Sequence, residues 1–287
     1  MDLLIQLTLN GLFNGAHFAL LAMGFALIFG TTGVVHFAYG PVYAVGAYAI
    51  WALAALVGLP FWAAVLLGIA FTAALGVGCY LFIYRPFEIS GSPPFVVLVA
   101  SLGLFIVMKN LIGIVFGTGV KTVDSVAYDV HFVGNAFFTT VQLGQVAAAL
   151  LVGCGIALFL RASRYGKAIR AMADNREMAT VIGIDTTRLS ILVFALGSAV
   201  SAVAGALVLL RDGLNPNMGF GAVFVAFVAV IVGGVGSLRG AVIAAFLLAF
   251  VQSLGMWQIP TEWQNTIVFV VLFGFLLARP SGIVRRA

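Results

Sequence analysis

Residues 189–210 read LSILVFALGSAVSAVAGALVLL, a stretch without a single charged side chain. A helix rises 1.5 Å per residue, so about 20 apolar residues cross the roughly 30 Å hydrocarbon core of a bilayer. Other runs of this kind occur along the whole chain, which predicts one all-α, polytopic transmembrane bundle over residues 1–287. The predicted spans are 4–29, 36–57, 61–84, 95–117, 141–161, 189–210, 222–238, 240–257 and 264–279. Because Gly and Pro interrupt several runs, we expect about 8–10 spans.

The composition agrees with a lipid-embedded chain. Of its 287 residues, 63% are hydrophobic and 8% are charged, whereas a soluble domain carries about 25% charged residues. With so few charges the chain cannot solvate a globular surface. A soluble fold is therefore excluded.

The basic residues predict the orientation. Of 14 Lys and Arg, 11 lie at span ends that can share one side of the membrane. The positive-inside rule makes that side cytoplasmic, so the N-terminus is predicted outside and the C-terminus inside. The net charge of +5 is then a topology signal, and no nucleic-acid partner is expected. The 11 are Arg85, Arg161, Arg164, Lys167, Arg170, Arg176, Arg188, Arg239, Arg279, Arg285 and Arg286; the opposite connections hold Asp2, Asp124, Asp129, Asp212 and Glu262 with only Lys121 and Arg211.

Two stretches rich in Gly and Pro, 30–41 and 212–221, lead into the second and seventh predicted spans. Backbone groups freed by Gly and Pro are tolerated in a membrane only against protein or a wet cavity. The two stretches follow spans of opposite direction, which predicts an inverted-topology repeat with the solute path at its interface; two ordinary turns are the alternative. The candidate path residues are Asn14, His17, His36, Tyr39, Tyr43, Asn215, Pro216 and Asn217, and the alternative for the histidines and tyrosines is a packing role.

The two longest connections are a cytoplasmic loop over 161–188 and a periplasmic loop over 118–140, which is long enough for a short external cap. In the cytoplasmic loop, apolar residues repeat at helical period and predict one amphipathic helix between Gly166 and Gly183. Asp185 or Thr186 is predicted to cap the next helix. Such a helix suits a groove on a cytosolic protein; the alternative is a helix lying on anionic headgroups. The predicted apolar ridge is Ile169, Met172, Ala173, Ala179 and Ile182, and the polar stripe is Arg170, Asp174 and Glu177.

Covalent chemistry is not expected from this chain. Cys79 and Cys154 lie inside apolar runs, and no catalytic dyad, metal-ligand spacing or cofactor motif occurs. The segment 233–240 is rich in glycine but lacks the GK[ST] ending of a nucleotide-binding loop. Solute passage powered by another chain is the leading interpretation. An ATP-independent secondary transporter or channel is the alternative, and an intramembrane enzyme is a further one.

Several motifs resemble the LivH-type inner-membrane permeases of branched-chain amino acid ABC importers, in the family's order along the chain. These are residues 37–48, 84–86, 163–174, 183–185, 215–220, 233–240 and 280–283. Lys109 departs from the pattern, which leads us to expect a neutral polar residue there.

The resemblance implies a multi-pass protein of the bacterial inner membrane. The implied partners are a LivM-type permease subunit in a heterodimer, two cytosolic ATPase subunits that carry ATP hydrolysis, a periplasmic amino-acid-binding protein and membrane lipid. It leaves the solute open among branched-chain and other amino acids, amides or urea, and aromatic acids. It also implies that 163–183 is gripped by an ATPase; the residues assigned to this coupling are Arg164, Gly166, Ile169, Arg170, Met172, Asp174, Glu177, Ala179 and Gly183.

Overall fold

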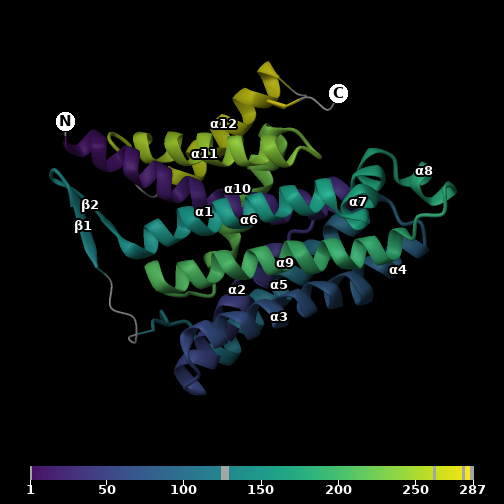
Figure 1. Cartoon of the computed structure of the whole chain (residues 1–287), viewed down its shortest axis with the longest axis horizontal. Helices are drawn as coiled ribbons and strands as arrows, with labels where there is room; N and C mark the ends of the chain where they lie inside the picture. Colours follow the sequence, from purple (N-terminus) through teal and green to yellow (C-terminus); the bar gives the residue numbers. More distant parts are fainter. Residues whose placement is uncertain (1, 124–128, 261–262, 280–281, 285–287) are drawn as a thin grey trace.

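The computed structural model describes residues 2–123, 129–260, 263–279 and 282–284, and these form an elongated bundle of helices (Figure 1). Asp124, Glu262, Pro280, Arg285 and Arg286, which enter the charge and motif arguments, lie outside the described residues. The helices are α1 (Asp2–Thr32), α2 (Tyr39–Trp51), α3 (Phe61–Cys79), α4 (Arg85–Ile89), α5 (Pro94–Phe116), α6 (Thr140–Ala162), α7 (Arg164–Asp174), α8 (Arg176–Val181), α9 (Thr186–Arg211), α10 (Met218–Gly233), α11 (Leu238–Gly255) and α12 (Gln264–Ala278), with π-helical turns η1 (Ala52–Leu56) and η2 (Tyr80–Tyr84).

The prediction of a polytopic helical bundle is confirmed. Within the described ranges, seven helical stretches are long and apolar enough to cross a membrane, and α10 and α12 are shorter apolar helices. In order, these correspond to the predicted spans. The largest difference is at α10, predicted over 222–238, which ends at Gly233 because Gly234 takes a positive φ of 102°. The structure does not test the inverted repeat, which stays a prediction.

A β-hairpin is the exception to the all-α prediction. β1 (Val130–Val133) pairs antiparallel with β2 (Ala136–Thr139), and Gly134 supplies the positive φ of the turn. The hairpin contacts the start of α1, where the Gln6 side chain exchanges hydrogen bonds with the Phe137 backbone. The described part of the loop predicted over 118–140 thus contains this hairpin, packed on the N-terminal helix; its position outside the membrane stays a prediction.

α1 lies in the middle of the bundle, packed against α6, α9, α10 and α11. Its residues from Ala16 to Ile28 are nearly all buried. α3, α5, α6 and α12 surround this centre and expose large apolar side chains, such as Phe71, Ile114, Leu151 and Phe273. The outer helices thus present a lipid-compatible surface, and the core lies around α1, α2, α9 and α10.

The chain's connections gather at two opposite ends of the bundle. α4, α7 and α8 lie at one end, and the N-terminus and the hairpin lie at the other (Figure 1). We call the first the basic end: it contains residues 30–38, 85–92, 161–188 and 234–239, and with them the Arg and Lys of those segments. The opposite end contains the start of α1, residues 117–123, the hairpin and residues 212–217, where Lys121 and Leu214 form a β-bridge.

Candidate functional site

The predicted coupling segment folds as two helices and not as one. Ser163 caps α7, its hydroxyl accepting the Gly166 amide proton at 2.8 Å. Asn175 has an extended φ of −152°, and its side chain caps α8 by accepting from the Met178 amide at 2.9 Å. Asn side chains are strong N-caps, so this residue ends one helix and starts the next. The single-helix prediction is wrong at Asn175.

The end of the segment follows the prediction. Gly183 has φ +84°, and the amides of Gly183 and Ile184 bond the carbonyls of Thr180 and Ala179, both at 3.0 Å. This is the Schellman pattern of a helix end. Asp185 then caps α9 by accepting from the Arg188 amide at 3.0 Å. The predicted stop and cap are confirmed.

Three residues of the predicted apolar ridge pack against the chain's own bundle and not against a partner protein. Ile169, Met172 and Ala179 are 1–2% exposed and belong to the chain's own core. These three ridge residues therefore hold α7 and α8 on the bundle, whereas Ile182, the last residue of the predicted ridge, is exposed. Gly166 likewise lies inside α7, not at its edge, where a Cβ would overlap the backbone at the end of α6.

Four large apolar side chains on this segment are exposed, and Ile182 of the predicted ridge is one of them. Tyr165 projects from α7, and Met178, Val181 and Ile182 project from α8 and its end. Their exposed fractions are 63%, 57%, 79% and 66%. Sequence periodicity assigned Ile182 to the ridge and missed the other three, because spacing alone does not show which apolar side chains stay exposed. We call Tyr165, Met178, Val181 and Ile182 the exposed patch.

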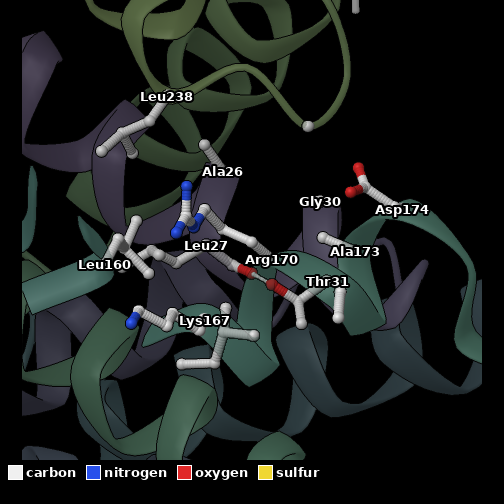
Figure 2. A pocket seen from close by; sticks show the side chains of 13 residues that line it. Ala26, Leu27, Gly30, Thr31, Leu160, Lys167, Arg170, Ala173, Asp174 and Leu238 are labelled. Atoms are coloured by element: carbon white, nitrogen blue, oxygen red, sulfur yellow. Dashed lines mark hydrogen bonds between the residues drawn. The ribbon is translucent and has the colours of Figure 1, made fainter. Parts of the chain in front are cut away.

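The polar stripe is also divided by the break at Asn175. Arg170 and Asp174 line a cavity of about 480 Å³ between α7, the end of α1 and the loop before α11. Figure 2 shows the Arg170 guanidinium among Ala26, Leu160 and Leu238, with Asp174 further along near Gly30. Glu177 lines another cavity, of about 560 Å³, between α8 and the residues that follow α1. The stripe is therefore not one continuous face.

An ion pair fastens α8 to the rest of the basic end. Arg176 pairs with Glu88 of α4, and its second guanidinium nitrogen donates to the carbonyl of Thr32 at 3.1 Å. Thr32 is the last residue of α1, where an unpaired carbonyl and the negative end of the helix dipole favour a cation. The Tyr80 hydroxyl donates to the other Glu88 oxygen at 3.0 Å. Arg176 thus links the coupling segment to the point where α1 ends.

His36 anchors the first interrupted stretch. Its Nδ1 lies 2.7 Å from the Tyr84 hydroxyl, which donates to the Ser101 hydroxyl at 3.0 Å. Since Tyr84 donates to Ser101, we assign the proton to Nδ1 of His36. Ser101 also accepts from the Ala38 amide at 3.3 Å. Tyr84 is the last residue of the π-helical turn η2, a distortion often found at functional sites.

The two interrupted stretches lead into helices that begin against each other. A Cβ on Gly40 would overlap the Gly219 carbonyl, and one on Gly219 would lie 2.7 Å from the Gly40 carbonyl. Both residues are in the first turn of their helices, α2 and α10. The N-termini of two helices therefore meet inside the bundle at van der Waals distance.

The remaining path candidates separate into two groups. Asn14, His17 and Tyr43 lie near Arg211, which donates to Asn14 at 2.8 Å and pairs with Asp212. Asn215 and Asn217 form a turn at the start of α10, the Asn215 carboxamide accepting the Asn217 amide proton at 3.0 Å. Pro216 is buried, and so are Tyr39 and Tyr43. The Tyr39 hydroxyl donates to the Leu21 carbonyl at 3.0 Å.

The polar cluster around Arg211 was not predicted as a unit. Arg211 also approaches Gln145 of α6 at 3.5 Å. Within the described part of the chain, His17 Nδ1 and Gln145 Nε2 are buried without a hydrogen-bond partner. Ionisable and polar groups within a bundle are costly and mark functional positions. The partners come from α1, α6 and α9, so no local sequence signal joins them.

These features define a class of protein: a membrane-spanning helical bundle in which two interrupted helices begin against each other in the interior and a two-helix segment lies at one end. Residues 7–276 match the family described as branched-chain amino acid transport system / permease component. The chain belongs to this permease family.

Two curated relatives and one solved structure agree with this membership. The high-affinity branched-chain amino acid transport system permease protein LivH of Escherichia coli K12 is 32% identical, and the alignment covers 98% of this chain and 96% of the relative. The corresponding protein BraD of Pseudomonas aeruginosa is 30% identical with the same coverage. PsaBC from Streptococcus pneumoniae in complex with Fab has a TM-score of 0.51 at 14% identity, over 94% of this chain and 89% of that chain, which shows a shared fold alone.

Proposed function

We propose that this permease carries branched-chain amino acids inward, driven by ATP hydrolysis on two separate cytosolic ATPase subunits. The names of the relatives supply the solute class. The exposed patch is the observation that carries the proposal. Met178, Val181 and Ile182 lie three and four positions apart on one face of α8 and its end, and large exposed apolar side chains outside the spans mark a protein interface. A second permease subunit and an external amino-acid-binding protein complete the transporter.

In this proposal α7 and α8 form one rigid unit on which the ATPases act. Ile169, Met172 and Ala179 pack this unit against the bundle. The exposed patch is not buried in that contact. When the ATPases close, α8 moves, and Arg176 passes the movement to Thr32 at the end of α1. The stretch after Thr32 contains His36 and leads into α2, so the movement reaches the helix start beside Gly219. Alternating access then follows from shifts of packed helices at this junction.

The solute path runs past the two helix starts. Helix N-termini that meet inside a bundle favour a carboxylate, because the positive ends of the two helix dipoles lie there. Tyr39 precedes Gly40 at the start of α2, Asn217 lies two residues before Gly219, and the candidates near Arg211 lie toward the opposite end. Asn215, Pro216 and Asn217 form the entry to α10. Their roles in the path rest on this placement.

The basic end faces the cytoplasm in this proposal, and the N-terminus faces outward. In a chain with Cys79 and Cys154 replaced by Ala, a cysteine at position 170 should react with a membrane-impermeant thiol reagent only after the cells are opened. A cysteine at position 135 should react in intact cells, because Asn135 is exposed in the hairpin turn. The opposite pattern would reverse the orientation and remove the ATPase site from the cytoplasm.

Replacing Met178 by Glu tests the exposed patch. Met178 is 57% exposed, so the substitution leaves the core intact but places a charge in the apolar contact. Interface anchors contribute 2 kcal/mol or more, so we expect ATPase binding roughly 30-fold weaker. The measurements are recovery of the ATPase with the purified permease and uptake of radiolabelled leucine.

Thr180→Glu is the matched control. Thr180 is exposed on the same helix and lies about 200° around the axis from Met178. This variant should retain the ATPase and most uptake. Equal behaviour of the two variants, whether both bind or both fail, would show that the exposed patch is not the contact.

A further inference from the structure

An apolar groove runs between α1, α6 and α11 on the outside of the bundle, with a volume of about 430 Å³. Small side chains on α1 and α6 leave the space, and larger side chains of α11 form its other wall. The lining residues include Ala16, Ala19, Ala149, Gly153, Val242 and Phe246. The groove opens on a helix, α6, whose neighbouring Leu150 and Leu151 are exposed. It therefore faces the hydrocarbon of the membrane.

One end of the groove is basic. Arg239 and Leu238 line it there, at the first turn of α11 in the basic end of the bundle. Leu238 also lines the 480 Å³ cavity that contains Lys167 and Arg170, and Figure 2 shows Arg170 beside it. The groove and the cavity thus adjoin at Leu238. Among the residues that line the groove and the cavity, Lys167, Arg170 and Arg239 are cationic and Asp174 is the one carboxylate.

We propose that groove and cavity together bind one anionic glycerophospholipid. An acyl chain occupies the groove, and the phosphate lies among Arg239, Arg170 and Lys167. The charge arrangement selects this ligand: the contact is apolar over its length and cationic at one end, at the depth where headgroups meet a span. A helix of another subunit would have no need of three cations at one end of its contact.

The site also explains why α7 has a cationic face and an apolar one. Lys167 and Arg170 line the cavity, while Tyr165 on the same helix belongs to the exposed patch. A lipid held at this place bridges α1, α6, α7 and α11. It goes beyond the transport function proposed above, because its binding requires no ATPase.

Native mass spectrometry of the purified full chain with equal phosphatidylglycerol and phosphatidylcholine tests the proposal. The wild type should retain phosphatidylglycerol preferentially. Each basic residue near an anionic headgroup is worth about a five-fold preference, so Arg239→Gln should lower the ratio by about five-fold. Arg188→Gln is the control, because Arg188 lies at the same end but is 85% exposed and pairs with Asp185. It should leave the ratio unchanged.

A second pair of variants tests the groove itself. Gly153→Leu fills it from α6, and only the flexible Met23 side chain lies near the added Cβ. Gly155→Leu adds the same bulk to α6 where nothing lies within 4 Å. Gly153→Leu should lose the bound lipid, and Gly155→Leu should keep it.

Three results would overturn the proposal. One is equal retention of the two lipids by the wild type, and another is an unchanged ratio in Arg239→Gln. The third is loss of the lipid when the other transporter subunits assemble on the chain, which would make the groove a protein interface.

Discussion

Arg176→Glu is expected to lower leucine uptake roughly ten-fold or more, the size that a lost coupling free energy of 1–3 kcal/mol produces. The substitution places two carboxylates together at Glu88 and removes the bond from Arg176 to the Thr32 carbonyl. α8 then loses its link to the end of α1. The ATPases should still bind, because the exposed patch is unchanged, so ATP hydrolysis and uptake become uncoupled.

The exchanged pair separates the two contacts of Arg176. Arg176→Glu combined with Glu88→Arg restores the ion pair but not the bond to Thr32, so uptake should recover in part. Glu88→Gln keeps an acceptor for the Tyr80 hydroxyl and should cost less, since an ion pair in contact with solvent contributes about 0–1 kcal/mol. If Arg176→Glu transports at the wild-type rate with ATPases bound, the link between α8 and α1 has no role in coupling.

Gly40→Ala should destabilise the permease by roughly 1–3 kcal/mol, the usual cost of overpacking a core. The added methyl group would overlap the carbonyl of Gly219. Because that carbonyl is backbone, the overlap can be relieved only if α2 and α10 move apart. Gly219→Ala should act in the same direction. The measurement is the apparent unfolding midpoint of the purified chain in detergent, followed by size-exclusion chromatography after heating.

Gly103→Ala is the control for this prediction. Gly103 lies within α5 and has nothing within 4 Å of an added Cβ. There, Ala should be neutral or stabilising, because it favours a helix more than Gly does. Equal midpoints for Gly40→Ala and Gly103→Ala would mean that α2 and α10 do not meet closely at Gly40.

The sequence predicts the spans well because membrane crossing leaves a local signal. A run of about 20 apolar residues is read from adjacent positions, and so are a Gly helix end and an Asp cap, as at Gly183 and Asp185. The break at Asn175 had a local signal too, since Asn followed by Arg-Glu-Met is a typical N-cap sequence. The helical periodicity on both sides of it favoured one continuous helix instead.

Periodicity does not show which surface an apolar helix face packs against. The spacing of Ile169, Met172 and Ala179 correctly indicates burial, but the same spacing fits a partner's groove or the chain's own core. The cluster around Arg211 shows the same limit, because Asn14 and Gln145 reach it from 197 and 66 residues away in sequence. Long-range contacts of this kind leave no pattern in one sequence.

Site-specific photo-cross-linking at Val181 tests the central claim, that 163–183 is the contact of the ATPases. Val181 is 79% exposed, the most exposed member of the exposed patch. A benzophenone amino acid at this position in intact cells should yield an adduct of the permease with an ATPase subunit. The same probe at Ile114, which is 79% exposed on the apolar surface of α5, should yield none with that subunit. If no ATPase adduct forms at Val181 while the transporter remains active, the claim is contradicted.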